Sequence, residues 1–438
     1  MNLFLEFPPV STEEWEAAVR ADLKGREPSS LGKILYRAED VAGLDFGDQP
    51  WPSRPWEIWA EVSDLAGARR ALGRGAEGLV VDHPTQDWSP LLQGIHLHTA
   101  AELGDWASDL RGTIETDTVS GALPGFRKAV AIPHDLPIAT QVELCRQEAH
   151  FLREVGSRLG IADETLRTHP MAHVLKTAAQ ISAADLVVPV GPSYFQEIAK
   201  FRAIRRLCPY SRIIARTSRW HATAYDPHVN LLRGTTGAMA AIIGGCDALI
   251  VGPFTEARGF ADDMAERLAL NTQLLLRDES YFGQVADPAA GSWYIESVTA
   301  ELLKGGTTGT SSNAFIGVNR YPNPGETSPE TITPGRAMTA LEQCRLRSER
   351  APRRPTVRLL RGTDAKMARA RAAFSRDFFI AGGFEVVEAE NADLTVLCDA
   401  DVNYQANRQW PVLAAGSDFG RHSDPAATIA AWQNRLGI

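Results

Sequence analysis

The sequence lacks the features that mark secreted, membrane-spanning and nucleic-acid-binding proteins. Its five cysteines are scattered without a CxxC pair, which predicts reduced thiols rather than a disulfide framework or a zinc site. It has no run of about 18 apolar residues, so we expect no transmembrane helix. The formal net charge is −9, and no basic stripe with interleaved aromatic residues occurs. Nucleic acid and membrane are therefore not expected partners.

The first residues give no targeting signal. The short apolar stretch in MNLFLEFPPVSTEEW is followed at once by acidic residues, whereas a signal peptide has a basic region and then a longer apolar one. Together with the reduced cysteines, this pattern predicts a cytoplasmic location.

The chain does have the composition of a globular protein, with 44% hydrophobic and 23% charged residues. Its 438 residues are too many for one ordinary core and predict two or three domains. Residues 53–304 contain short β-branched runs, several of them separated by helical patterns such as 138–156 and 192–206. The expected strands are residues 57–62, 78–82, 95–99, 129–133, 185–190, 212–216 and 248–251.

Runs of this kind are typical of a parallel sheet buried on both faces. Seven or eight such units over ~250 residues favour a (β/α)8 TIM barrel over an open sheet.

Three further segments flank the expected barrel. Residues 1–52 read as an N-terminal arm with one helix, which Ser11 and Glu14 begin as a capping box. Residues 305–354 open with GGTTGTSS and read as a linker that ends in a charged helix over 337–350. Residues 355–438 show a strand–helix–strand–strand pattern, with the elements at 356–360, 365–381, 384–388 and 394–398. This pattern predicts a small, doubly wound, flavodoxin-type domain.

Several long motifs resemble one family in the right order along nearly the whole chain. They include FPPVSTEEWEAAVRADLKG, YFQEIAKFRAIRRL, DPHVNLLRGTTGAMAAIIGG and ADPAAGSWYIESVTAEL. Together they resemble methylmalonyl-CoA mutase, and the first motif resembles its small (beta) subunit. The resemblance implies an N-terminal arm, an acyl-CoA barrel, a linker and a flavodoxin-like cobalamin domain, which is the order of segments described above.

The resemblance also shows where this chain departs from catalytic subunits. There, the strand resembling residues 212–216 leads into H-x-Q-T-S-G-W, and its His and Gln face the acyl group. Here Ile214 stands for that His and Arg216 for that Gln. The following strand of catalytic subunits reads G-G-T-Q-S-L-H-T-N. This chain has Asp247 for its Gln, Ile250 for its His and Gly252 for its Asn.

A radical rearrangement needs neutral donors that hold the thioester carbonyl and exclude water. Isoleucine and glycine have no side-chain donor, and we expect Arg216 and Asp247 to pair with each other or to fill space. Of the family's Tyr-His pair, which corresponds to residues 133–134, only His134 remains. It is a weak candidate for residual contact with a substrate.

The cobalamin motif departs as well. The family places D-x-H-x-x-G after the first strand of this domain, where the His ligates cobalt and the Asp orients the His. Here Asp364 is followed two residues later by Lys366, and residues 355–420 contain no histidine. We therefore expect this degenerate motif to bind no cofactor, and we expect adenosylcobalamin in the partner subunit.

Other candidate residues have simpler interpretations. His96 and His98 alternate along a strand, and without a convincing third ligand they are expected to be packed or hydrogen-bonded rather than metal-bound. The basic residues of 192–206, Lys200, Arg202, Arg205 and Arg206, are expected on an exposed face that can meet solvent or an acidic partner.

The sequence thus leads to a hypothesis and a rival. The hypothesis is a non-catalytic small subunit that forms a heterodimer with a catalytic large (alpha) subunit and stabilises it, in a mutase interconverting methylmalonyl-CoA and succinyl-CoA. The rival is a stand-alone acyl-CoA mutase or CoA-thioester-binding enzyme with altered acyl specificity, using His134 and Arg216. The absence of a cobalt ligand favours the first.

Overall fold

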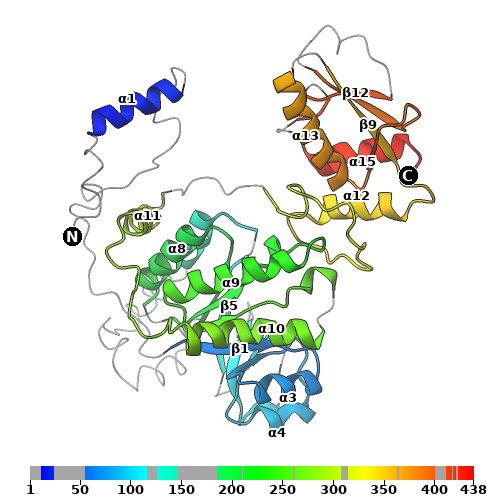
Figure 1. The fold of residues 1–438 in the computed structure, drawn as a ribbon. Helices are drawn as coiled ribbons and strands as arrows, with labels where there is room; N and C mark the ends of the chain where they lie inside the picture. Colours follow the sequence, from blue (N-terminus) through cyan, green and yellow to red (C-terminus); the bar gives the residue numbers. More distant parts are fainter. Residues whose placement is uncertain are drawn as a thin grey trace.

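The computed structural model comprises two α/β units and an N-terminal helix (Figure 1). It describes residues 11–23, 55–101, 103, 105–115, 126–133, 135–146, 185–209, 211–259, 262–306, 314–362, 365–399, 411–416, 418–420 and 423–438. Among these residues, no helix is both long and apolar enough to cross a membrane. Helix α1 (Thr12–Asp22) begins with the predicted capping box, since the Ser11 amide donates to Glu14 Oε2 over 2.8 Å and the Glu14 amide to Ser11 Oγ over 3.2 Å.

Eight parallel strands form a closed barrel in sequence order, with β1 paired to β8. This confirms the predicted TIM barrel. The strands are β1 (Glu57–Glu61), β2 (Gly78–Val80), β3 (His96–Thr99), β4 (Arg111–Glu115), β5 (Phe126–Ala131), β6 (Asp185–Val190), β7 (Ile213–Thr217) and β8 (Ala248–Ile250). Seven of them match the sequence prediction, and β4 was missed.

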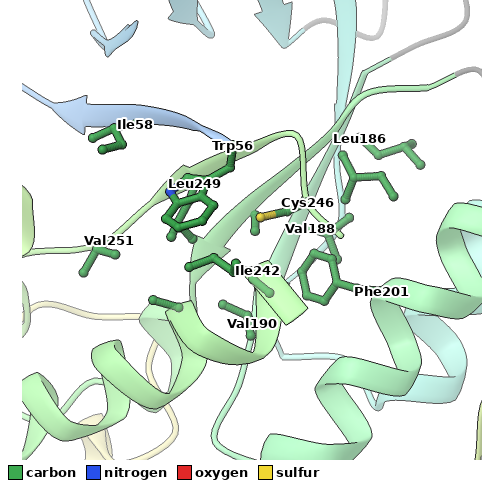
Figure 2. Close-up of a cluster of buried hydrophobic side chains, with 14 of the residues drawn as sticks. Trp56, Ile58, Leu186, Val188, Val190, Phe201, Ile242, Cys246, Leu249 and Val251 are labelled. Atoms are coloured by element: carbon green, nitrogen blue, oxygen red, sulfur yellow. The ribbon is translucent and has the colours of Figure 1, made fainter. Parts of the chain in front are cut away.

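Helices cover the outside of the barrel (Figure 1): α3 (Leu65–Gly73), α4 (Ser89–Leu92), α8 (Tyr194–Leu207), α9 (His228–Ile243), α10 (Asp263–Leu274) and α11 (Trp293–Leu303). Figure 2 shows how the outward side chains of the strands, such as Val188 and Leu249, meet Phe201 of α8 and Ile242 of α9. Because alternate residues of a strand face opposite sides, the remaining strand residues point into the barrel.

The second unit is a four-stranded parallel sheet in the order β10-β9-β11-β12. Its elements are β9 (Thr356–Arg361), α13 (Ala365–Ala381), β10 (Glu385–Val387), β11 (Leu394–Cys398), β12 (Val412–Ala414) and α15 (Pro425–Arg435), preceded by α12 (Thr339–Arg350). The small doubly wound unit was predicted, whereas β12 and α15 were not. Its core is rich in aromatic rings, and Phe379 stacks on Trp432 with ring centroids 5.3 Å apart.

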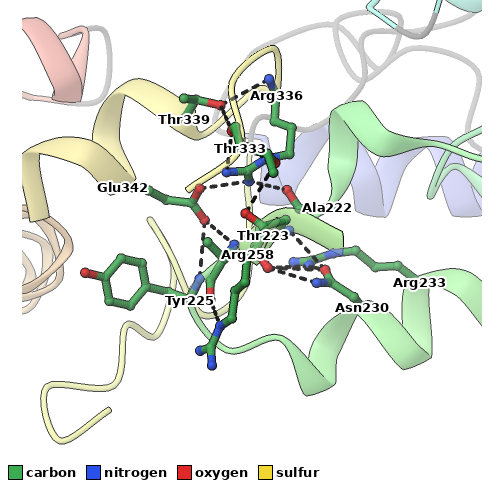
Figure 3. Close-up of polar contacts among 12 residues, drawn as sticks. Ala222, Thr223, Tyr225, Asn230, Arg233, Arg258, Thr333, Arg336, Thr339 and Glu342 are labelled. Carbon is green, nitrogen blue, oxygen red and sulfur yellow. Dashed lines mark hydrogen bonds and ion pairs between the residues drawn. The ribbon is translucent and has the colours of Figure 1, made fainter. Parts of the chain in front are cut away.

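Polar contacts fix α12 against the loop that follows β7 (Figure 3). Glu342 of α12 accepts hydrogen bonds from the amides of Ala224 (2.7 Å) and Tyr225 (3.4 Å). Arg336 pairs with Glu342 over 2.8 Å and donates to the carbonyl of Ala222 over 2.8 Å. The guanidinium of Arg345 lies 3.9 Å from the centroid of the Tyr225 ring. Thus α12 is bound to the end of the barrel where the β7 loop emerges.

Candidate functional site

The carboxyl-end mouth of a TIM barrel is where catalytic groups are found, and here a buried ion cluster occupies it. Arg216, near the end of β7, makes a bidentate pair with Glu61 of β1: Nε lies 2.6 Å from Oε1 and Nη2 lies 2.8 Å from Oε2. Nη2 also lies 2.8 Å from Oε2 of Glu256, in the loop after β8. The more exposed Arg219 reaches Glu61 Oε1 over 3.1 Å. We call Glu61, Arg216 and Glu256 the mouth triad.

Within the mouth triad, Glu61 and Arg216 hold each other ionised. Burial alone would raise the pKa of Glu61, but the attraction and hydrogen bonds of Arg216, with a smaller contribution from Arg219, lower the pKa from 4.5 to about 2. Burial would likewise lower the pKa of Arg216, yet Glu61 and Glu256 raise it above its ordinary value. A general acid or base needs a pKa near the working pH, so neither Glu61 nor Arg216 is suited to move protons near neutral pH.

Gly252 leaves space for the Glu256 side chain of the mouth triad. A Cβ atom at this position would lie 2.8 Å from Glu256 Oε2, which is closer than such contacts allow. The Gly252 amide donates to Thr217 Oγ1 over 2.8 Å, which ties the loop after β8 to β7. The position where the family resemblance implied an Asn is thus filled by the carboxylate of Glu256.

Below the mouth triad the barrel interior is apolar. Ile214 and Ile250, two of the positions where the sequence departs from catalytic subunits, are fully buried there against Trp59, together with Ala129, Val187 and Ala248. These apolar side chains therefore fill this part of the barrel interior. A pocket beside the mouth, lined in part by His221, Asn230 and Arg233, has a volume of about 30 Å³. Pockets for organic ligands typically measure about 300–1,000 Å³.

A polar layer lies at the other end of the interior. His98 Nδ1 is 2.6 Å from Thr113 Oγ1, and His96 Nε2 is 3.4 Å from the same oxygen. The His96 ring stacks on Trp59 with centroids 4.5 Å apart. These contacts confirm the prediction that both histidines are packed and hydrogen-bonded. In the described residues, no group of three or more His, Cys, Asp or Glu side chains is placed to hold a metal ion.

The stability of the barrel should depend on pH through the buried His96 and the half-buried His221. Burial and nearby arginines lower the pKa of His96 from 6.5 to about 3 and that of His221 to about 4. Below pH 6.5 the unfolded chain protonates these rings while the folded chain does not, so stability falls as the pH falls from 6.5 toward 4. We expect up to about 1.4 kcal/mol per pH unit from each histidine.

Urea unfolding at pH 7.0, 5.5 and 4.5 measures this dependence. The double variant His96→Gln/His221→Gln should have a shallower decline in the free energy of unfolding. If wild type and double variant decline equally, other groups govern the acid sensitivity.

Arg216 and Asp247 are expected from the sequence to pair with each other or to fill space, and the pairing is wrong. Asp247 instead lies 2.5 Å from Arg205 Nη2 of α8 and accepts the Ile213 amide over 2.7 Å, so it fixes the start of β7 from outside the barrel. Side-chain parity explains the error: residue 247 precedes the inward-facing residue Ala248, whereas Arg216 follows the inward-facing Ile214 by two positions.

The basic residues of α8 do not form an exposed face. Lys200, Arg202 and Arg205 are all buried. Arg202 reaches Glu296 Oε1 over 2.7 Å and Asp287 Oδ2 over 2.8 Å, which ties α8 to α11. Lys200 pairs with Glu197 of the same helix over 2.5 Å. The carboxylates that pair with Arg202 and Arg205 lie far along the chain, where the pattern of one helix cannot reveal them.

In the C-terminal unit, the described end of β9 does not suit a cobalt ligand. Lys366 is exposed on α13, and a lysine ammonium has no acceptor lone pair to offer a metal. Asp399 is buried against the end of β9: a Cβ atom at Gly362 would lie 1.7 Å from its Oδ2. Residues 355–420 contain no histidine. Asp364 and His134 lie outside the described residues.

The sequence patterns did not identify Glu61 and Glu256 as members of the site. Glu61 carries a usable signal, since it lies two residues after Trp59 and so shares its inward face. Glu256 lies in a loop whose path no periodicity defines.

The chain is an α/β protein of the TIM-barrel class. The carboxyl end of its eight-stranded parallel barrel contacts a small doubly wound unit. Residues 176–308 match the family model described as methylmalonyl-CoA mutase. The chain is 27% identical to the methylmalonyl-CoA mutase small subunit of Porphyromonas gingivalis, in an alignment covering 97% of this chain and 94% of that protein. It is 32% identical to the small subunit of Streptomyces virginiae, covering 71% of this chain and 65% of that protein.

A third relative, the probable small subunit of Mycobacterium tuberculosis, is 26% identical, and the alignment covers 86% of this chain and 77% of that protein. The chain belongs to the methylmalonyl-CoA mutase family. The alignment with the P. gingivalis protein spans 583 positions, which exceeds the 438 residues of this chain. That relative therefore has segments without a counterpart here.

Proposed function

We propose that this chain is the non-catalytic small subunit of a heterodimeric, adenosylcobalamin-dependent methylmalonyl-CoA mutase. In this proposal it binds and stabilises a catalytic large subunit, which interconverts methylmalonyl-CoA and succinyl-CoA. The similarity to three proteins named as small subunits supports the pairing with a large subunit.

The mouth triad is the observation that carries the non-catalytic role. In this barrel the guanidinium of Arg216 is held by two carboxylates, and it stands where the resemblance implies a neutral amide that contacts the acyl group. Freeing it for a substrate would leave the half-buried carboxylates of Glu61 and Glu256 without their shared cation, which is unfavourable. The isoleucines below it offer no hydrogen bond to a thioester.

We place adenosylcobalamin in the partner because the residues of the C-terminal unit do not fit it. An imidazole ligand is absent from residues 355–420, and the buried side chain of Asp399 packs against the backbone at the end of β9.

Purification of the chain alone and together with a large subunit tests the proposal. The large subunit should carry intact H-x-Q-T-S-G-W and D-x-H-x-x-G motifs. We expect a stable 1:1 complex that has mutase turnover and cobalamin absorbance, and an isolated small chain that has neither. Stoichiometric cobalamin on the isolated chain, or mutase turnover by it, would favour the stand-alone enzyme that uses His134 and Arg216.

A further inference from the structure

A large groove on the C-terminal unit is lined by arginines. It has a volume of about 1,160 Å³ and runs between α13 and the strands β9 and β10. Five of its 17 lining residues are arginines: Arg354, Arg358, Arg361, Arg369 and Arg376. Only two lining residues, Glu385 and Glu388, are acidic. The groove is thus a positive region in a chain whose net charge is −9.

The charge of the groove is only partly neutralised within the chain. Arg358 faces Glu390 over 3.8 Å, but the Glu390 side chain is 91% exposed, so this pair is weak. Arg354 pairs with Glu349 over 3.5 Å and donates to the carbonyl of Gly383 over 2.7 Å. Arg361 and Arg376 are exposed and form no ion pair with any residue that the structure describes. An external anion can therefore pair with these two guanidiniums without breaking an ion pair to the described residues.

The arginines are spread along the groove rather than gathered at one point. Arg369, Arg376 and Ile380 follow one another along α13, and eleven residues of helix rise about 16 Å. The six residues of β9 extend about 20 Å. A single phosphate would reach only part of this length, whereas an extended polypeptide of about six residues matches it.

The floor and edge of the groove also suit an extended chain. Between the arginines lie apolar side chains, among them Leu360, Ala373 and Val387. Strand β10 is the edge of its sheet, and no described strand pairs with its outer side. In the parallel pairing with β9, Glu385 donates to Pro355, so the alternate residue Val386 directs its amide and carbonyl outward. An exposed edge of this kind accepts an added strand.

We propose that the arginine groove binds an extended, acidic polypeptide segment of a partner protein. The segment lies along β10, and its alternate acidic side chains face the groove and pair with Arg361 and Arg376. Bidentate arginine–carboxylate pairs give this recognition its geometry. The inference does not depend on the proposed mutase role.

Binding of a dye-labelled, eight-residue peptide of alternating Glu and Val to the full chain tests the inference by fluorescence anisotropy. We expect saturable binding that weakens with salt, and at least about tenfold weaker binding to Arg361→Glu/Arg376→Glu. The matched control is Arg347→Glu/Lys366→Glu, which changes the net charge equally at exposed positions outside the groove. It should weaken binding less than about threefold.

Amide exchange gives a second readout, since an added strand should slow exchange at Val386, whose amide points outward. The inference is wrong if both double variants weaken binding equally, because net charge alone would then explain it. It is also wrong if a Gln-Val peptide of the same length binds as tightly. Binding of inorganic pyrophosphate to the arginines, with no binding of the acidic peptide, would identify a small-anion site instead.

Discussion

Replacing Arg216 with alanine is expected to lower the free energy of unfolding by about 3–5 kcal/mol, because removal of one partner from a buried ion cluster leaves the others uncompensated. Glu61 and Glu256 would remain side by side in the barrel mouth without their shared cation. The pKa of Glu61, now held near 2 by Arg216, would then rise, and the carboxyl would take up a proton near neutral pH more readily.

Urea unfolding of the isolated chain measures this loss, and Arg219→Ala is the matched control. Arg219 contacts the same Glu61 oxygen, but its side chain is 58% exposed. An exposed pair contributes at most about 1 kcal/mol, so the control should remain near wild type. The combined variant Arg216→Met/Glu61→Gln/Glu256→Gln removes all three charges, and we expect it to recover much of the loss.

The same Arg216→Ala variant distinguishes a structural role from a catalytic one. Where the variant chain still assembles with the large subunit, turnover per complex should stay within about twofold of wild type. Turnover lower by orders of magnitude in an intact complex would show that Arg216 contacts substrate, and the non-catalytic proposal would then be abandoned.

The sequence predicts the barrel well because buried parallel strands have a local signature. The segment LVVPV of β6 and the segment IIA of β7 are apolar throughout, and each strand is followed by a helix. Strand β4 has only Thr113 and Ile114 as β-branched residues between Gly112 and Glu115, which is too short a signal. Local patterns therefore identify seven of the eight strands. Strand β4 becomes evident only in the closed barrel of the structure.

The ion pairs of the site could not be predicted in the same way. Arg216 and Glu61 are 155 positions apart, and they meet because barrel closure brings β1 within reach of β7. Arg202 is buried beside Glu296, 94 positions away. A charge pattern on one helix indicates solvent exposure only when no distant element carries the opposite charge. Here Glu296 and Asp247 are distant residues of opposite charge that pair with arginines of α8, so the expectation of an exposed α8 face was wrong.

Trp59 is the largest side chain that fills the barrel interior, and Trp59→Ala is expected to cost about 3–5 kcal/mol of unfolding free energy. The ring is fully buried, stacks on His96, and donates from Nε1 to Glu57 Oε2 over 3.1 Å. Its removal leaves a cavity bordered by Ile214, which cannot close without moving strands. The matched control is Trp293→Ala, since Trp293 is 49% exposed at the start of α11.

Gly78 provides a test of whether this ring sets the packing of the interior. A Cβ atom at position 78 would lie 2.5 Å from Trp59 Nε1, so Gly78→Ala should overpack the barrel and cost about 1–3 kcal/mol. In a Trp59→Phe background the smaller ring leaves room for the methyl group, and the cost of Gly78→Ala should largely disappear. A double-mutant cycle of unfolding free energies measures this coupling. If the costs of Gly78→Ala and Trp59→Phe are additive, the requirement for glycine at position 78 comes from the backbone and not from the indole ring of Trp59.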